Sequence, residues 1–286
     1  MLIAGHNGGV KNFAVASTGT FTSVTSFDSS VGRGNETSST VAITTGTDQQ
    51  ILQFFIPPSI TSVLKLPMHD RSGWSISHRD TIRGVSSSPC GLYIATWGIG
   101  SDVMCWDVRS GKMLINLSGH EAPVKSVSFG AGEGGGNESE KIVLVSGDTE
   151  GVIILWRCHN KEENDESDEN DEVEIENETE TEIKISHTTT SAMGWTREEI
   201  LTWHHHKVPI RSASFCGSND NVVSCDATGK VLIVDSKTGE IQTEFVGGGL
   251  SCSAWAYWNK TAESNEYLLV TASLNTMIVW NTKVSE

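Results

Sequence analysis

The ten-residue phrase HEAPVKSVSF at residues 120–129 recurs, with conservative changes, as HKVPIRSASF at residues 206–215. The pattern behind it, H-x-x-x-[V/I]-[K/R], begins at His6, His78, His120 and His206, and a degenerate form, VGGGLS, occupies residues 246–251. A short run that alternates apolar and polar residues follows each histidine phrase, as is typical of a half-buried β-strand. The sequence therefore predicts one β-unit repeated along the chain.

The second half of each unit has a common pattern as well. A turn of small residues is followed by a β-rich run that ends in a large side chain, as in ATWGIGSDVMCWD (95–107), SGDTEGVIILWR (146–157), SCDATGKVLIVD (224–235) and TASLNTMIVWN (271–281). In the first unit TTGTDQQILQFF (44–55) fills this place, with Phe55 where tryptophan is expected. TREEILTW (196–203) would form at most one or two helical turns, so we expect an all-β chain.

A repeat near 42 residues with a Gly-His start and a Trp-Asp end resembles the WD-repeat (WD40) β-propeller family. The resemblance implies a single propeller of four-stranded antiparallel blades over residues 1–286, with approximate units 1–66, 78–118, 119–160, 204–245 and 246–286. It assigns structural repeat positions to His6, His78, His120, His206, Phe55, Trp106, Asp107, Trp156, Val234, Asp235 and Trp280. It also implies that the N-terminal strand completes the last blade.

Five detectable units are fewer than the roughly seven blades common in this family. A truncated chain, a cryptic blade within 56–77, and a ring completed by another protein are all open at this point. The family's usual turn aspartate, six residues before the tryptophan, is replaced by Gly100, Glu150 and Thr228. We therefore expect the buried His–Ser–Asp–Trp hydrogen-bond network of the family to be incomplete in these blades.

The charge of the 286-residue chain is concentrated in one segment. The formal net charge is -16, and residues 161–182 contain 13 acidic side chains and one lysine. Like charges at this density repel one another, so residues 161–183 are predicted to be a disordered acidic insertion. Three roles are open: docking of a basic partner such as a histone, a ribosomal protein or a nuclear-import tail; covering of a basic site on the same chain; and a solubilising insertion without a partner.

We expect no secretory leader from the first residues, MLIAGHNGGV, and no stretch of the sequence approaches the roughly 20 apolar residues of a membrane helix. Its six cysteines show no metal-binding or disulfide spacing, so we expect free thiols in a reducing compartment. These features predict an intracellular protein, cytoplasmic or nuclear or both, without a membrane partner.

The strongest candidate binding residues are cations. Lys11, Arg83, Lys125 and Arg211 each lie five residues after the histidine of their unit, and Ser251 takes this place in the degenerate unit. In a propeller these positions are related by the rotation axis and lie near one mouth of the central channel. We expect a basic ring that attracts carboxylate- or phosphate-bearing partners, with ordinary solvated side chains as the alternative.

Two other motifs contain candidate binding residues. WDVR at 106–109 is similar to the W-D-x-R pattern of propellers that act as substrate receptors of cullin-type ubiquitin ligases, where Arg109 would meet the adaptor. The HHH run at 204–206 is not expected to bind a metal ion, because adjacent residues of a strand point to opposite faces.

No motif for a catalytic residue or a cofactor occurs, and the negative charge argues against direct nucleic-acid binding. The sequence predicts a non-enzymatic scaffold that assembles a multiprotein complex through one propeller face. The alternatives are the ubiquitin-ligase receptor and a chromatin or ribosome-assembly factor that uses the acidic insertion.

Overall fold

The computed structural model describes residues 2–3, 10–18, 39–56, 65–66, 75–130, 141–160, 194–216, 220–246, 253–261, 264–272 and 277–283. Strands joined by turns make up these ranges, and none of their residues is helical. Within this part of the chain no helix is long and apolar enough to cross a membrane. The predicted acidic insertion and His6 lie outside the described residues.

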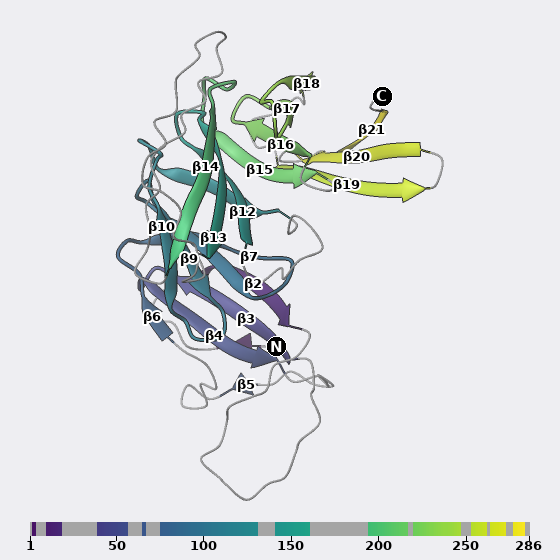
Figure 1. The fold of residues 1–286 in the computed structure, drawn as a ribbon. Helices are drawn as coiled ribbons and strands as arrows, with labels where there is room; N and C mark the ends of the chain where they lie inside the picture. The colour runs from purple at the N-terminus through teal and green to yellow at the C-terminus, as the bar shows by residue number, and fades with distance from the viewer. Residues whose placement is uncertain are drawn as a thin grey trace, which may run out of the picture.

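The strands form consecutive antiparallel sheets of the kind expected for propeller blades, and Figure 1 shows them in order along the chain. The first sheet contains β2 (Val10–Thr18), β3 (Ser39–Gly46), β4 (Gln50–Ile56) and β6 (Ser75–Ser77). The second contains β7 (Ile82–Ser87), β8 (Tyr93–Gly98), β9 (Val103–Asp107) and β10 (Met113–Leu117).

The third sheet contains β11 (Val124–Phe129), β12 (Lys141–Asp148), β13 (Ile153–Asn160) and β14 (Trp195–Trp203). The fourth contains β15 (Ile210–Cys216), β16 (Asn221–Asp226), β17 (Lys230–Asp235) and β18 (Ile241–Val246). The last has three described strands, β19 (Ser253–Thr261), β20 (Ser264–Ala272) and β21 (Met277–Lys283). The all-β prediction and the four-stranded antiparallel blades are confirmed.

The structure corrects the interpretation of residues 196–203. This segment is a strand, β14, that pairs with β13 along its length, and not one or two helical turns. Trp195, Leu201 and Trp203 are buried, and burying these side chains in the blade outweighs the helix-forming glutamates between them. The third blade therefore takes its outermost strand from beyond the predicted acidic insertion.

The register of the first sheet assigns the predicted repeat position of Phe55 to its neighbour Phe54. Trp106 pairs with Ile94, two residues before Thr96, and Phe54 has the matching place opposite Ala42, two residues before Thr44. Phe55, the residue expected to replace tryptophan, pairs with Val41 instead. The prediction was one residue off because two consecutive phenylalanines fit the same pattern.

The two short strands at the edge of the fold bear on closure of the ring. β1 (Leu2–Ile3) was expected to complete the last blade, but it pairs in parallel with β5 (Lys65–Leu66). Residues 75–77 of the segment considered for a cryptic blade form the outer strand of the first sheet. The number of blades in the complete ring stays a prediction.

The core lies between successive sheets and explains the apolar runs in the central strands. Ile142 and Leu144 of β12 pack toward the second sheet, whereas Val143 and Val145 pack toward the fourth. A third apolar cluster, with Ile43 and Trp106, joins the first two sheets. Each middle blade therefore buries both of its faces, which is why its strands read as continuous apolar runs.

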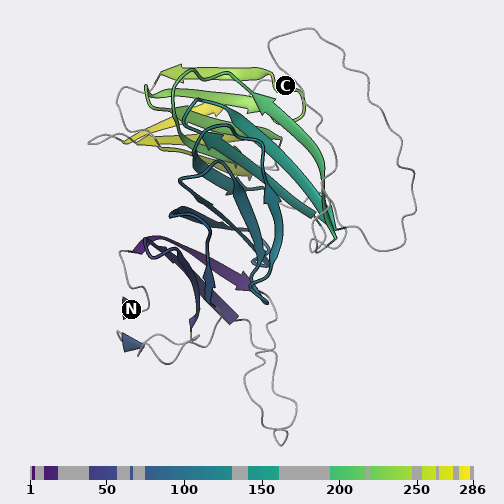
Figure 2. The same cartoon turned by 90° about the vertical axis from the view of Figure 1, so that its left-hand side faces the viewer.

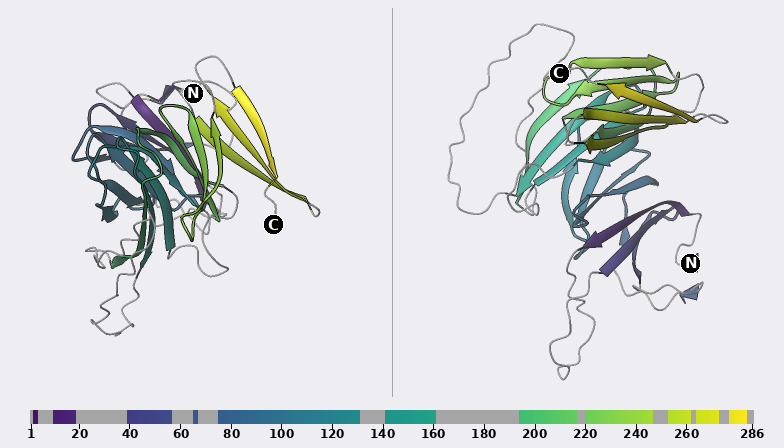
Figure 3. Two further views of the ribbon diagram at one scale, coloured as in Figure 1. Left: turned by 90° about the horizontal axis from the view of Figure 1, so that it is seen from above. Right: turned by 90° about the vertical axis from the view of Figure 1, so that its right-hand side faces the viewer.

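The blades follow one another along an arc, as Figures 2 and 3 show. The innermost strands β2, β7, β11, β15 and β19 contact one another in this order. Because these strands all run in one direction, the beginnings of all of them lie at the same end of the blades. We call this the cation end, for the residues described below, and the opposite end the far end.

Candidate protein-binding site

The four predicted cations occupy one structural position in four blades. The pairing register of the innermost strand skips Lys11, Arg83, Lys125 and Arg211, each the second residue of its strand. In the third blade, for example, Val124 pairs with Asp148 and Ser126 pairs with Gly147, so Lys125 is the extra residue of a bulge. A bulge redirects the side chain of its extra residue, so the local backbone aims each cation in the same way.

Buried apolar neighbours fix the beginning of three of these strands. Ile82, Val124 and Ile210, the residues immediately before the cations, are fully buried. The residue before each of them accepts a backbone hydrogen bond from the turn of its own blade, from Ile99 to Thr81, from Thr149 to Pro123 and from Ala227 to Pro209. The same contacts thus hold each cation at the same height on its blade.

Direct bonds between blades fix the spacing of neighbouring cations. The Ser126 hydroxyl accepts a hydrogen bond from the amide of Ala213 at 3.0 Å, which ties β11 to β15. The amide of Val124 donates to the carbonyl of Gly100 at 3.3 Å, which ties the start of β11 to the second blade. Lys125 is therefore anchored to the blades on both of its sides.

Three of the cations form one electrostatic group. The pKa of Lys125 lies below its ordinary value, first because of partial burial and then because of the positive charges of Arg83 and Arg211. Arg83 and Arg211 are exposed, and Lys125 is half-buried between them. In the part of the chain that the structure describes, no carboxylate forms an ion pair with these three residues or with Lys11. We call Arg83, Lys125 and Arg211 the basic triad.

The third blade contains the buried His–Ser–Asp–Trp hydrogen-bond network that was expected to be incomplete. In the third blade His120 Nδ1 lies 2.8 Å from Asp148 Oδ2 and its Nε2 lies 2.6 Å from Ser146 Oγ. Trp156 Nε1 donates to the same hydroxyl at 2.7 Å. The network is complete in this blade, so the expectation was wrong for the third blade.

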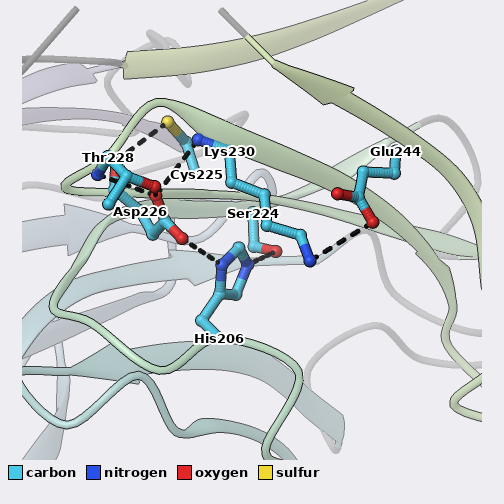
Figure 4. Close-up of polar contacts among 7 residues, drawn as sticks. All are labelled: His206, Ser224, Cys225, Asp226, Thr228, Lys230 and Glu244. Atoms are coloured by element: carbon cyan, nitrogen blue, oxygen red, sulfur yellow. Dashed lines mark hydrogen bonds and ion pairs between the residues drawn. The ribbon is translucent and has the colours of Figure 1, made fainter.

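The fourth blade has the same arrangement without the tryptophan, as Figure 4 shows. His206 lies between Asp226, at 2.9 Å, and Ser224, at 2.7 Å, and Val234 has the tryptophan position. Asp226 also accepts hydrogen bonds from the amides of Thr228 and Lys230, which closes the turn between β16 and β17. The aspartate lies eight residues before the tryptophan position, not six, and the signal that could have found it is the Ser-x-Asp spacing of SGD and SCD.

The charges in these networks follow from burial and hydrogen bonding. Burial lowers the pKa of His206 more than its bond to Asp226 raises it, so the ring is neutral near pH 7. Burial would raise the pKa of Asp148 and Asp226, but the hydrogen bonds to each carboxylate hold it below the ordinary value. A neutral ring donates through Nδ1 to the carboxylate and accepts the serine proton at Nε2.

The histidine run 204–206 does not converge on one point. His206 belongs to the buried network, His205 Nε2 lies 2.9 Å from the carbonyl oxygen of Gly239, and His204 is exposed. Within the described ranges no group of three or more His, Cys, Asp or Glu side chains is placed to hold a metal ion. Among the described residues, Cys90, Cys105, Cys158 and Cys225 are free thiols.

The remaining candidate residues lie at the far end. Asp107 and Asp235, which follow the tryptophan position, accept hydrogen bonds from the amides of Ser110 and Lys237 and close the turns there. Arg109 is exposed in the same turn as Asp107. Asn160 and Trp195, which flank the acidic insertion, are also at the far end, because β13 runs away from the cation end and β14 returns to it.

Comparison with known proteins finds one relative that is similar to part of this chain. The chain is 35% identical over 79 residues to the Periodic tryptophan protein 2 homolog of Neurospora crassa, a match that covers 27% of this chain. The match covers only 8% of that relative's length. No family model matches the chain. The resemblance to WD-repeat proteins thus stands on the blades, their shared network and this relative.

Proposed function

We propose that the chain is a non-enzymatic scaffold that assembles a multiprotein complex by binding acidic segments of partner proteins at its cation end. The observation that carries the proposal is the repeated bulge, which gives four blades a cation at the same position, and three of these form the basic triad. Cations held in a fixed array without acidic partners attract anionic ligands and speed their association. The likeness to a WD-repeat protein supports the same general role.

The far end supplies a second candidate interaction. Arg109 is exposed there in the WDVR turn, on a blade adjacent to the one that carries the acidic insertion. An adaptor of a cullin-type ligase that contacted Arg109 would approach from the side opposite the basic triad. Docking of a basic partner on the acidic insertion is a third candidate interaction.

The experiment is a native pull-down with mass spectrometry on the intact chain and three variants. The first variant replaces Lys11, Arg83, Lys125 and Arg211 with alanine, the second lacks residues 161–182, and the third carries Arg109→Ala. We expect the intact chain to recover a defined complex, and the first variant alone to lose the acidic members of that complex.

The outcomes separate the two ends of the molecule. If the alanine variant recovers the same proteins as the intact chain, binding at the cation end is wrong. Selective loss of a ligase adaptor with Arg109→Ala would establish the receptor alternative. Loss of basic proteins on deletion of 161–182 would establish docking by the insertion. Melting curves of every variant show whether a loss reflects unfolding.

A further inference from the structure

We propose that a second copy of this chain docks its last blade against the first blade, on a face of strand β2 that is exposed in the single chain. Three large apolar side chains of β2 form this face, which we call the open face: Val10, Phe13 and Val15, with exposed fractions of 55%, 67% and 48%. The open face lies on the side of a blade and not at the cation end, so the inference goes beyond the proposed function.

The equivalents of Val10 and Phe13 are buried in the next three blades. Val10 directly precedes the cation of its strand, and Phe13 follows that cation by two residues. The residues directly before the other three cations are fully buried: Ile82, Val124 and Ile210. The residues two places after these cations are buried as well: Val85, Val127 and Ala213. The same strand positions therefore belong to the core in three blades and to the surface in the first.

The pairing register supports this equivalence. In each blade the residue two places after the cation pairs with a serine or threonine of the second strand. The four pairs are Phe13 with Thr44, Val85 with Thr96, Val127 with Ser146, and Ala213 with Ser224. The exposure of Phe13 is therefore a difference in surroundings and not a difference in strand position.

In the other blades, the preceding blade covers these positions. Ile82 and Val85 of the second blade share an apolar cluster with Ile43 of the first. The corresponding residues of the third and fourth blades lie in the clusters that join them to the second and third sheets. Ala14, between Phe13 and Val15 on β2, packs toward the second blade, so the open face points away from it. The surface that fits the open face is therefore the apolar face of another β-sheet.

The last sheet of the chain has the form that this contact requires. Its strand β19 contacts β15 and β16 of the fourth sheet, and Figures 1 and 2 show it at the opposite end of the arc from the first sheet. Strands β20 and β21 contain the continuous apolar runs YLLV (267–270) and MIVW (277–280). Such runs are typical of strands in a sheet that is buried on both faces. They indicate a second neighbouring sheet, which no described part of the same chain supplies.

A second copy supplies both missing neighbours through one contact. Its last blade would cover the open face in the way that each blade covers the next within the chain. The parts of this sequence outside the described ranges are too short for a blade of about 40 residues, and the longest of them, 161–193, is rich in acidic side chains. Because the contact joins two unlike surfaces, the copies associate head to tail, into a closed ring or an open series.

The test measures self-association of the full chain by analytical ultracentrifugation at increasing concentrations up to about 100 µM. The open-face variant carries Phe13→Asp and Val15→Asp, which would place two carboxylates in an apolar contact. The matched control carries Ile241→Asp and Val246→Asp on β18, where the side chains are 44% and 74% exposed. All four side chains are exposed, so the substitutions should spare the fold, and melting curves of both variants check this.

We expect the wild type and the control to form oligomers whose population rises with concentration. The open-face variant should raise the dissociation constant of self-association at least about tenfold, because it disrupts the centre of the contact. A fluorescently labelled open-face variant should still join the wild type, since its last blade is intact. In excess, it should convert the wild-type oligomers into complexes of one copy of each chain.

Four results overturn the proposal. They are a wild type that stays monomeric over the whole range, an open-face variant that associates like the wild type, an equal loss in the control, and a labelled variant that does not join wild-type oligomers. The last result would mean that two open faces meet each other. A monomeric wild type whose open-face variant loses a WD-repeat protein in the pull-down would assign the face to that protein instead. None of these measurements involves the four cations, so failure here leaves the proposed function to its own test.

Discussion

The second and third blades have the same strand order but stabilise the start of the blade differently. In the third blade His120, Ser146, Asp148 and Trp156 form the complete buried network. In the second, Trp106 still donates to Thr96 at 2.8 Å, but Gly98 replaces the aspartate. The His78 ring is hydrogen-bonded only within its own turn, with Nδ1 at 3.0 Å from the Asp80 carbonyl oxygen, and its buried Nε2 has no hydrogen-bond partner in the described structure.

The difference shows which features the fold requires. Both blades keep the four antiparallel strands, the buried tryptophan and the bulge that presents the cation. The aspartate and the histidine bond are absent from one of them. The network therefore adds local stability to a blade whose shape is already set by strand pairing and by packing between sheets.

Replacing the network histidine should give the largest loss of stability, and it is the most direct test of the difference between the two blades. His120→Leu would leave the buried Asp148 carboxylate without its main partner, and we expect it to cost about 3–5 kcal/mol of unfolding free energy. The matched change His78→Leu removes one nitrogen that has no partner and one local bond to the Asp80 backbone, and it should stay within about 1 kcal/mol of the wild type. Chemical denaturation of both variants is the measurement, and equal costs would refute the comparison.

Supplying the missing aspartate should not repair the second blade. A Cβ atom at position 98 would lie 2.6 Å from the carbonyl oxygen of Thr81, so Gly98→Asp forces the backbone apart. We expect a loss of about 1–3 kcal/mol despite the new partner for His78. A higher melting temperature than that of the wild type would show that the turn can adjust and that the network is only one substitution away.

The smallest effect is a difference in pH dependence. Burial lowers the pKa of both His78 and His206 below the ordinary value of 6.5, so the folded chain binds fewer protons than the unfolded chain. The contribution of these two histidines to the free energy of unfolding is fully present above pH 6.5, and it is lost as the pH falls through their folded pKa values. The pKa values of Asp148 and Asp226 lie below 3.8, so their contribution declines only in stronger acid.

Melting curves between pH 7 and pH 5 test this sign. His78→Leu should match the wild type at pH 7 and lose less stability on acidification, because one of the two histidines is gone. A variant that follows the wild-type slope would mean that His78 does not gain a proton on unfolding in this range.

The repeat made the blades and the cations predictable, but it could not reveal how they are supported. The pattern H-x-x-x-[V/I]-[K/R] located Lys125 and Arg211 five residues after their histidines, and the structure places both at bulges. The bulge itself was hidden, because a skipped residue leaves the alternation after it looking like an ordinary strand. Strand β14 was missed because a long acidic segment separates it from the rest of its blade.

The network was misread for a related reason. Its aspartate was sought at a fixed distance from tryptophan, whereas Asp148 and Asp226 are identified by the serine two residues before them and by the turn they close. The spacing of cations across neighbouring blades depends on tertiary contacts such as Ser126 with Ala213, which are 87 residues apart. No local pattern encodes a contact of that range.

The bulge also separates the residues that the fold requires from a residue that can be substituted without loss of the fold. The extra residue of a bulge has no pairing partner in the ladder, and in this fold its side chain stays outside the core. A substitution at such a position alters the surface offered to a partner while the blade below it keeps its register. Under the proposed function, substitutions at the four equivalent positions would change the binding specificity of one blade at a time, at little cost to folding.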